Sequence, residues 1–508
     1  MNEWDRQSRL AVSKACDDYG RGRLCRRDFL QLCAMAGFGF SSPHFLLGKN
    51  NGAISTKTSG LPSNWADSLS SPAQQAFLKD VGKHFRGTRL RIVTEDTPPS
   101  RATKAIMEKE FIPLTGIEVE WDQFSLDKVL SKVTADTSRQ IGRHDIFYLD
   151  QAWIGRFCDD MVSPLALMDK PDLAYPDYRF DDFLAPLVEN AATYQGKLAA
   201  IPYDIAIFIT MYRKDIFRQL GLQVPKTVHE YLHVVKTVNK AMSPRVYGTT
   251  GQWRAGHYGL ECHMTMWLWA FGGSIFNADG SCAISDSRAK EAMEFMMELG
   301  KYMPPGVTEW DWHGEADSFR SGRSAIYSSW GEFFPSFDDP ATSKIVGLAE
   351  AAPCPHPIAL KKKSDCAFDE TPGVSHQGGS SLGISKYSRN IEAAWIFLQW
   401  ATSAEVTLRA CLMGGGASLI RRSSYSHPMT AEKACVATGT TRHMPVTLDA
   451  IMNHMGTEPH LPAWPSLSTR FAIELGKMTS GQQSIPATLS NMTLEANKVV
   501  PKKRISKR

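Results

Sequence analysis

The sequence of 508 residues has no long, uninterrupted apolar run. A transmembrane helix needs about 20 predominantly apolar residues, so no segment is predicted to cross a membrane. An excess of charge of one sign is also missing, because the formal net charge is only +4. A nearly balanced surface lacks the basic footprint of a nucleic-acid-binding protein. Motifs for a nucleophilic serine or cysteine, for phosphate-cradling loops and for dinucleotide binding are absent as well.

Cysteine is present without a clear disulfide framework. Three of the ten cysteines lie before residue 49, which leaves an odd number in the rest of the chain and at least one thiol without an internal partner. Cys354 and Cys366 either close one disulfide loop in an oxidising compartment or remain two reduced thiols, and the sequence leaves both open. Scattered His and Cys residues at 257–264 and 354–357 lack the ligand spacing of a zinc site. We therefore predict neither a metal nor a cofactor.

Residues 23–48, "RLCRRDFLQLCAMAGFGFSSPHFLLG", combine a basic flank with a short, weakly apolar run. The glycines of this run and Pro43 argue against a core helix. The heptapeptide "CRRDFLQ" resembles the twin-arginine export signal, Ser/Thr-Arg-Arg-x-Phe-Leu-Lys, and departs from it at Cys25 and Gln31. An arginine pair on an ordinary amphipathic helix is the alternative interpretation.

We therefore predict that residues 1–48 are an export signal and that the protein works in the periplasm. The residue before Cys33 is not small, as a lipidated cysteine would require, so we predict a soluble protein and not a lipoprotein. Residues 49–87 are predicted to be a linker, because their first part is rich in Ser, Asn and Gly with little periodicity. Residues 501–508 form a basic tail.

Strand-like and helix-like patterns alternate from residue 88 onward and indicate an α/β fold. The order is strand 88–96, helix 100–116, strand 117–124, helix 125–143 and strand 145–150. This order is typical of a parallel sheet with helices on its faces. The patterns return later as strands near 206–215, 324–330 and 380–385 and as helices near 227–242, 285–303 and 390–402.

Several blocks occur in order over roughly residues 88–500: "TGIEVEW", "HDIFYLDQAWIGRFCDDMVSPL", "GKLAAIPYDIAIFITMYRKDIFRQLGLQVPKTVHEY", "MWLWAFGGSIFNADG", "SFRSGRSAIYSSWGEFF", "LGISKYSRNIEAAWIFLQWATSAEV" and "LPAWPSLSTRFAIELGKMTSGQ". Their order and spacing resemble those of the carbohydrate-type solute-binding proteins of ABC importers, the group that includes maltose-binding protein. The resemblance implies a two-lobed, periplasmic-binding-protein-like (type II) fold with the ligand cleft between the lobes.

The same resemblance implies the lobe boundaries and the activity. Lobe 1 is expected at 88–204 and 386–425, and lobe 2 at 205–385 and 426–500, with crossings near Asp204-Ile205 and Gly379–Ser385 as the hinge. Such a protein captures a sugar or polyol by hinge closure and delivers it to membrane permease subunits, without catalysis. We expect a monomer.

Candidate ligand-binding residues lie where the predicted strands end, because ligands of open parallel sheets collect beyond the carboxyl ends of the strands. Aromatic rings cover the aliphatic face of a sugar, and carboxylates accept hydrogen bonds from its hydroxyls. Glycines at the proposed crossing let backbone N–H groups approach a ligand. Core packing of each tryptophan and a helix-cap role for Asp150 are the alternatives. The candidates are Trp330, Asp150, Trp153, Tyr203, Asp204, Glu95, Trp267, Gly378, Gly379, Ser380 and Trp464.

Two rival functions stay open. A secreted glycosidase also lines a cleft with rings and acids, but it needs two carboxylates at a fixed separation across the scissile bond, and the sequence fixes no such pair. The second rival is a binding protein for a metal or a polyamine on the same two-lobe plan.

Overall fold

The computed structural model of the chain describes residues 70–356, 359–415, 418–435 and 441–500. The chain divides into two compact units, Met1–Ser63 and Asn64–Arg508, and all described elements belong to the second. The predicted export signal, the basic tail and the linker up to residue 69 lie outside the described residues. None of the helices in the described ranges combines the length and the apolar character that a bilayer crossing requires.

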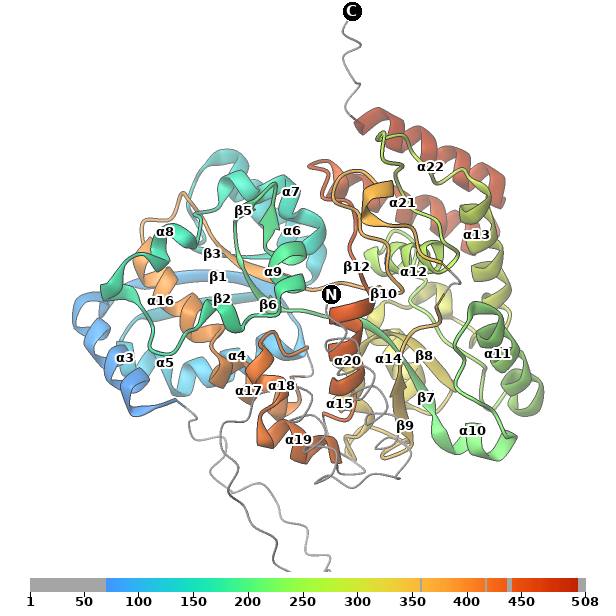
Figure 1. Ribbon diagram of the computed structural model, residues 1–508, viewed down its shortest axis with the longest axis horizontal. Helices are drawn as coiled ribbons and strands as arrows, with labels where there is room; N and C mark the ends of the chain where they lie inside the picture. Colours follow the sequence, from blue (N-terminus) through green and yellow to red (C-terminus); the bar gives the residue numbers. More distant parts are fainter. Residues whose placement is uncertain (1–69, 357–358, 416–417, 436–440, 501–508) are drawn as a thin grey trace, which may run out of the picture. The chain divides into compact units, whose positions relative to one another are not determined.

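The first sheet has the strand order β2-β1-β3-β11-β6 (Figure 1). Strand β1 pairs in parallel with β2 and β3, whereas β11 is antiparallel to β3 and β6. β3 is the run "IFYLD", buried at every position, as expected for a strand covered on both faces. The bounds are β1 Arg89–Glu95, β2 Glu118–Phe124, β3 Ile146–Asp150, β6 Ile201–Asp204 and β11 Ser380–Ile384.

Helices from two distant parts of the chain surround this sheet (Figure 1). The chain returns to it with β11, so residues 380–384, which were expected in lobe 2, belong to the first sheet because they pair with β3 and β6. The helices are α3 Pro72–Phe85, α4 Pro98–Lys109, α5 Phe111–Thr115, α6 Leu126–Arg139, α7 Ile154–Phe157, α8 Leu165–Met168, α9 Ala185–Ala191, α16 Ile391–Ala401 and α17 Ala404–Ala410. Two short strands, β4 Thr193–Tyr194 and β5 Lys197–Leu198, form a separate hairpin.

Helix α3 corrects one expectation, since it lies within the range 49–87 that was predicted as a linker. Ser71 accepts a hydrogen bond from the Gln74 amide at 3.2 Å, and the Gln74 side chain accepts one from the Ser71 amide at 2.7 Å. This capping box starts a helix directly after the polar stretch. Leu78 and Val81 then bury the inner face of the helix.

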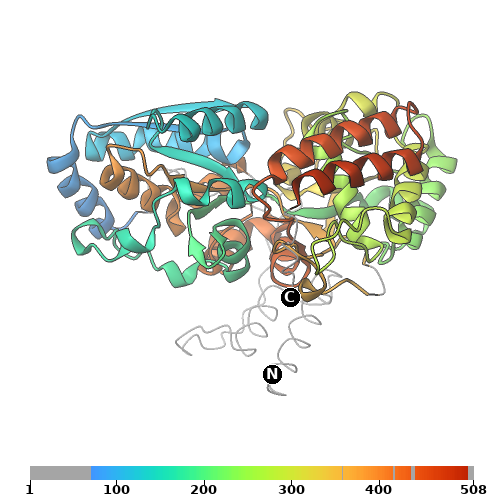
Figure 2. The ribbon, with the colours of Figure 1, turned by 90° about the horizontal axis from the view of Figure 1, so that it is seen from above.

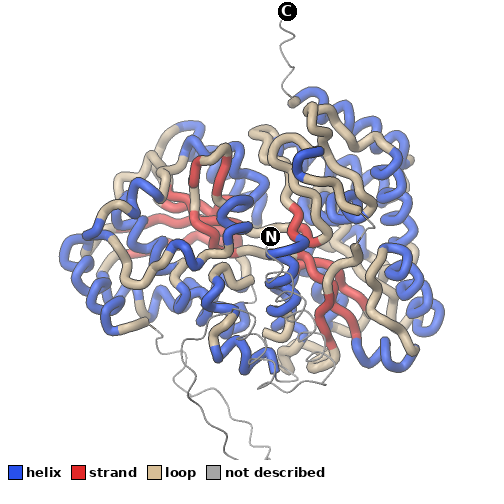
Figure 3. The backbone as a smooth tube through the Cα atoms, viewed as in Figure 1, coloured by secondary structure: helices blue, strands red, loops and turns tan. Residues whose placement is uncertain are grey.

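The second sheet has the order β8-β7-β9, with both pairs antiparallel. β10 and β12 form a separate parallel pair. Figure 3 shows the strands of the first and second sheets as two groups among the helices. The bounds are β7 Phe208–Arg213, β8 Ile326–Trp330, β9 Ala349–Ala352, β10 Ser375–His376 and β12 Met455–Gly456.

The helices around the second sheet include one that is buried on every side. All residues of α12 after Tyr258 are buried, because its apolar side chains cover the whole circumference. Helices α21 and α22 lie side by side (Figure 2). The bounds are α10 Lys214–Leu220, α11 Val228–Met242, α12 Tyr258–Ala270, α13 Ser287–Gly300, α14 Trp312–Arg320, α15 Phe334–Phe337, α20 Met444–Asp449, α21 Trp464–Thr479 and α22 Ile485–Val499. Helix α18 Arg422–Tyr425 packs against α17, and α19 Pro428–Cys435 lies beside α18 (Figure 1).

Two neighbouring segments connect the sheets. The chain passes from β6 to β7 through residues 205–207 and from β10 to β11 through residues 377–379. An isolated β-bridge joins the two segments, and the Gly378 amide donates to the Ala206 carbonyl at 2.8 Å. Both crossings are therefore short and hydrogen-bonded to each other.

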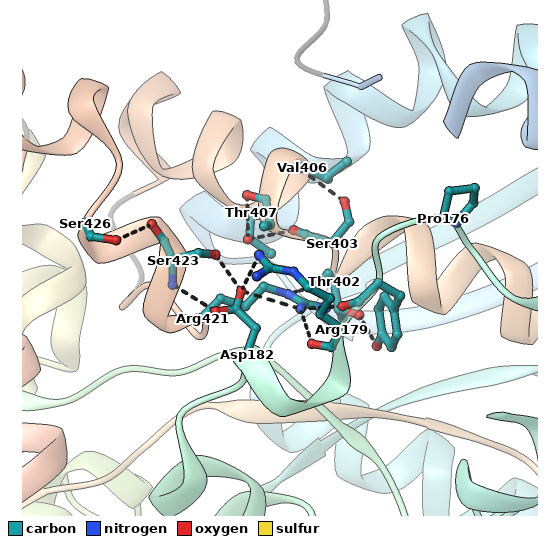
Figure 4. A network of polar contacts seen from close by, with 12 residues as sticks. Pro176, Arg179, Asp182, Thr402, Ser403, Val406, Thr407, Arg421, Ser423 and Ser426 are labelled. Atoms are coloured by element: carbon teal, nitrogen blue, oxygen red, sulfur yellow. Dashed lines mark hydrogen bonds and ion pairs between the residues drawn. The ribbon is translucent and has the colours of Figure 1, made fainter. Parts of the chain in front are cut away.

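Arg421 fastens the returning part of the chain to the first sheet's helices (Figure 4). Its side chain is 1% exposed and lies 3.9 Å from the Asp182 carboxylate. It donates to the carbonyl oxygens of Thr402 at 2.8 Å and Tyr178 at 2.6 Å. Asp182 in turn accepts from the Ser423 amide at 3.0 Å. A buried guanidinium with these partners holds three separate segments in one arrangement.

The two cysteines left open by the sequence are not bonded to each other. Cys354 is buried, Cys366 is half-buried, and both are free thiols. Burial raises the pKa of the Cys354 thiol to about 12, so this thiol stays protonated and unreactive.

Candidate functional site

Three carboxylates meet at one edge of the first sheet. Glu95 and Asp150 end the parallel strands β1 and β3, and Asp204 ends β6. Ser380, which begins β11, is the register partner of both Asp150 and Asp204. The carboxyl ends of β1, β3 and β6 thus meet at one edge, which is where ligands of such sheets bind.

A narrow hollow of about 30 Å³ lies at this edge and is lined from both sheets; we call it the cleft. Its first wall belongs to the first sheet and its second wall to the second sheet, with the connecting segments between them. The first wall is Glu95, Thr97, Leu126, Tyr148 and Asp150, the second wall is Tyr258, Trp312, Trp330 and Glu332, and the connecting segments add Ala206, Gly378 and Gly379.

A larger hollow of about 380 Å³ lies on the second lobe alone, among residues 253–256, 308–309 and 473–482. It meets no strand end and has no counterpart from the first sheet. The position of the cleft makes it the better candidate for ligand binding, despite its smaller size.

Asp204 lies directly behind the first wall and is 1% exposed. Its Oδ2 accepts hydrogen bonds from Thr97 Oγ1 at 2.6 Å and from Tyr148 Oη at 3.1 Å. Its Oδ1 is buried and has no hydrogen-bond partner among the described residues. Burial raises the pKa of Asp204 to about 6, and the hydrogen bonds from Thr97 and Tyr148 oppose this rise.

Burial also raises the pKa values of Glu95, Asp150 and Glu332 well above the usual range. The charges of Glu332, Asp204 and Asp150 add to the rise in the pKa of Glu95. The charge of Asp204 likewise adds to the rise in the pKa of Glu332. The Ala152 amide donates to Asp150 Oδ1 at 2.9 Å and opposes the rise in the pKa of Asp150. The cleft therefore gathers carboxyl groups that disfavour one another's ionisation.

Trp330 is held from behind by three contacts. It ends β8, and its indole Nε1–H donates to Gln252 Oε1 at 3.2 Å. Its ring lies 4.1 Å, centroid to centroid, from the Phe208 ring. A Cβ at Gly378 would lie 2.4 Å from the indole, so a glycine is needed beneath the ring. Gly379 is constrained in the same way, because its φ is +75° and a Cβ there would lie 2.1 Å from the Asp204 carbonyl oxygen.

A buried hydrogen-bond network supports the second wall. Glu458 accepts from Tyr258 Oη at 2.9 Å and from Trp464 Nε1 at 2.7 Å, and its other oxygen lies 2.8 Å from His376 Nε2. Ligand atoms of Cys262, His376 and Glu458 lie within 4.8 Å of one another, which is close enough for a metal. Both oxygens of Glu458 already have hydrogen-bond partners, so the network serves as a support for Tyr258.

The structure brings some of the predicted site residues to the cleft. Glu95, Asp150, Trp330, Gly378 and Gly379 line it, and Asp204 stands behind Tyr148. The other candidates are not among the described residues that line it: Trp153, Tyr203, Trp267, Ser380 and Trp464.

The aromatic candidates outside the cleft pack in the core instead. Trp267 lies against Tyr231 and Phe295, at 5.3 and 4.8 Å between ring centroids. Trp464 is 0% exposed and supports Glu458 through its N–H. These positions follow the core alternative, which is the more frequent one for tryptophan.

Several residues of the cleft were not predicted. Tyr148 stands two positions before Asp150 on β3 and therefore on the same face, which the strand pattern could have shown. Glu332 lies two residues after Trp330, in a segment already singled out. Tyr258 and Trp312 begin helices α12 and α14, and no pattern in the sequence marks them as neighbours of a strand end.

Known proteins resemble this chain in sequence and in fold. Residues 104–437 match the family model of bacterial extracellular solute-binding proteins. A probable amino-acid ABC transporter periplasmic-binding protein of Sinorhizobium fredii is 26% identical over 369 residues, which are 69% of this chain and 78% of that protein. The mannitol-binding protein of Pseudomonas aeruginosa is 26% identical over 290 residues, which are 56% of this chain and 62% of that protein.

A solved structure has the same fold. It is an ABC transporter solute-binding protein from Agrobacterium radiobacter in complex with ribitol, with a TM-score of 0.72 and 24% sequence identity. The match covers 82% of this chain and 99% of that one. The two-lobed α/β fold predicted from the sequence is therefore confirmed.

Proposed function

The chain belongs to the bacterial extracellular solute-binding proteins, and on that premise we propose that it captures a sugar or polyol for the membrane permease of an ABC importer. The observation that carries the proposal is the cleft, where carboxylates at the strand ends of one sheet face aromatic rings from the other. Rings and carboxylates together suit a hydroxyl-rich solute. The mannitol-binding relative and the ribitol-bound neighbour support a polyol.

Hinge closure provides the mechanism. Residues 205–207 and 377–379 act as the hinge between lobe 1 (88–204 and 380–425) and lobe 2 (208–376 and 426–500). A solute touches both walls only when they are closed, so it shifts the balance toward the closed form by its differential affinity. Micromolar binding corresponds to about −8 kcal/mol, which a stacked ring and several charge-assisted hydrogen bonds supply after entropy losses.

The solute leaves unaltered, since we expect no catalysis. A glycosidase would convert oligosaccharides, and product analysis after long incubation tests this directly. Any turnover above a heat-inactivated sample would favour the glycosidase.

Export by the twin-arginine route to the periplasm, and action there as a monomer, complete the proposal. Residues 26 and 27 lie outside the described part of the chain, so the test is genetic. Replacement of both arginines by lysine in a reporter fusion should retain the reporter in the cytoplasm, whereas unchanged export would contradict this route.

The decisive experiment is titration calorimetry against ribitol, mannitol, erythritol, glucose and maltose. We expect binding of at least one of these, and a loss of about 2 kcal/mol, or about 30-fold in affinity, in Trp330→Ala, because a ring that covers the ligand is removed. Trp310→Ala, outside the cleft, is the matched control and should bind like the wild type. Equal losses in both variants, or no binding of any member, would overturn the proposal.

A further inference from the structure

The cleft gathers several carboxyl groups without a lysine or arginine among the described residues that line it. Glu95, Asp150 and Glu332 line it, and Asp204 lies behind them. Arg101 is the cation whose charge acts on Glu332, but its guanidinium is half-exposed and paired with Asp96 at 2.7 Å.

Buried carboxylates outside the cleft have different neighbouring groups. Most of those in the described chain lie against a cationic or imidazole partner, as buried acids usually do. Glu315, with the weakest such pairing, still lies 3.7 Å from the His263 ring. The other pairs are Glu110–Arg409, Asp136–His144, Asp182–Arg421, Asp338–Arg442 and Glu458–His376. Asp145, Glu261 and Glu370 lack such a partner too and accept hydrogen bonds from Ser388, Thr265 and Trp269 instead. The cleft differs from these sites because several acids are gathered in one hollow without a cation.

The hydroxyl and indole donors of the cleft are largely used within the protein. The bonds are Thr97 and Tyr148 to Asp204, Tyr258 to Glu458, and Trp330 to Gln252. Once ionised, the carboxylates of the cleft therefore offer a solute mainly acceptor oxygens, and a cation beside them would favour that ionised form. A hydroxyl brings acceptor lone pairs that need donors, whereas an alkylammonium brings three donors and no acceptor.

The aromatic rings of the cleft also suit an alkylammonium group. Tyr148, Tyr258, Trp312 and Trp330 line the hollow together with the acids. The face of an aromatic ring attracts a cation, most strongly for tryptophan. Rings and carboxylates without a competing lysine or arginine favour an organic ammonium group over a neutral or anionic one.

We propose that the solute carries a protonated amine, which lies among Glu95, Asp150 and Glu332 and against the aromatic rings of the cleft. The inference rests on the proposed function, since it takes the cleft as the solute site, and it narrows the solute class. Two sources supply this group: an amine-bearing polyol or sugar, and an alkyl polyamine. The buried, unpartnered Oδ1 of Asp204 adds a negative potential behind the site when Asp204 is ionised.

Titration calorimetry near neutral pH, with pairs of compounds that differ by an amine in place of a hydroxyl, tests whether the cleft prefers a positively charged solute. The pairs are 1-amino-1-deoxy-D-glucitol with D-glucitol, 2-amino-2-deoxy-D-glucose with D-glucose, and putrescine with 1,4-butanediol. In at least one pair the amine should bind at least about tenfold more tightly than the hydroxyl compound. Tighter binding of the hydroxylated amines identifies an amine-bearing polyol or sugar, and tighter binding of putrescine identifies a polyamine.

The outcomes separate this inference from the proposed function. If neutral polyols bind as tightly as their amines or more tightly, the amine inference is overturned and the polyol function stands. If only putrescine binds, the amine inference stands and the sugar or polyol function fails. If no probe binds, both are overturned.

Substitutions of the cleft acids test which side chains bind the amine. Glu332→Gln and Glu95→Gln should each reduce the amine-to-hydroxyl affinity ratio at least about fivefold, because each removes one counter-charge. Glu309→Gln, an exposed acid of the larger hollow, is the matched control and should keep the wild-type ratio. Thermal unfolding of each variant verifies the fold. An unchanged ratio in both folded cleft variants would overturn the inference.

Discussion

The two walls of the cleft are built in different ways. The acids Glu95 and Asp150 of the first wall stand at the ends of neighbouring strands, so the hydrogen-bond register of the sheet sets their spacing. The rings of the second wall come from three unrelated places, the end of β8 and the beginnings of α12 and α14. Most of the acids are thus positioned by the first sheet, and most of the rings by one strand end and two helix starts of the second lobe. A solute that contacts both sets must draw the walls together.

The largest effect is expected from Asp204→Asn, which tests the electrostatics of the first wall. A folded-state pKa of about 6 against an ordinary value of 3.8 means that the native protein binds more protons than the unfolded chain between these values. The stabilising contribution of Asp204 is fully present below about pH 4 and is lost as the pH rises through about 6.

The free energy of unfolding of the wild type minus that of Asp204→Asn should therefore fall by about 3 kcal/mol from pH 4 to pH 7, at about 1.4 kcal/mol per pKa unit. Urea unfolding at several pH values measures this difference. A difference that does not depend on pH would contradict a raised pKa of Asp204 in the folded protein.

The next effect is expected from Asp150→Asn. The amide keeps the shape of the side chain and an oxygen for the Ala152 amide, so the fold should persist. Loss of a charge-assisted hydrogen bond should weaken solute binding by about 2 kcal/mol, measured by calorimetry with the solute found in the panel. Asp172→Asn, at an exposed position of the same lobe, should leave binding unchanged. Equal binding by both variants would remove Asp150 from the site.

A smaller effect is expected from Gly378→Ala, which tests how the second wall is held. The added methyl would lie 2.4 Å from the Trp330 indole and should push the ring, at a cost to binding of about 1.5 kcal/mol. The tryptophan emission of the unliganded protein should change as well. Unchanged affinity would mean that the ring position does not limit binding.

The smallest effect is expected from Thr97→Val, which removes one hydrogen bond to Asp204 and keeps the volume of the side chain. Stability near neutral pH should fall by about 1 kcal/mol. Because this bond lowers the pKa of Asp204, the pH-dependent step should also move to higher pH. A step that moved to lower pH would contradict the donor role of Thr97.

The sequence predicts the first wall better than the second for a physical reason. Strand ends can be located from periodicity, so Glu95, Asp150 and Trp330 could be proposed from the pattern of apolar runs. Tyr258 and Trp312 depend on how helices pack, which is decided by contacts between residues far apart in the chain. Trp267 and Trp464 were proposed for the cleft but pack in the core. An aromatic residue near a predicted cleft has the same local sequence whether it faces the cleft or the core.

Most of the secondary structure could also be predicted, because the apolar periodicity is strong. The exception is α3, whose beginning depends on the reciprocal hydrogen bonds of Ser71 and Gln74 after a stretch without periodicity. The antiparallel placement of β11 between β3 and β6 is a long-range pairing that no local pattern reveals.

The placement of β11 determines when the first sheet can be completed during synthesis of the chain. An interior position of the first sheet, between β3 and β6, is filled by residues 380–384, which are synthesised long after these two strands. A growing chain on the ribosome therefore carries β3 and β6 with open edges, which are prone to pair wrongly, until about three quarters of the polypeptide has emerged. Neither lobe can be obtained by a single cut of the chain, and any quality control that senses completion has to wait for this late strand.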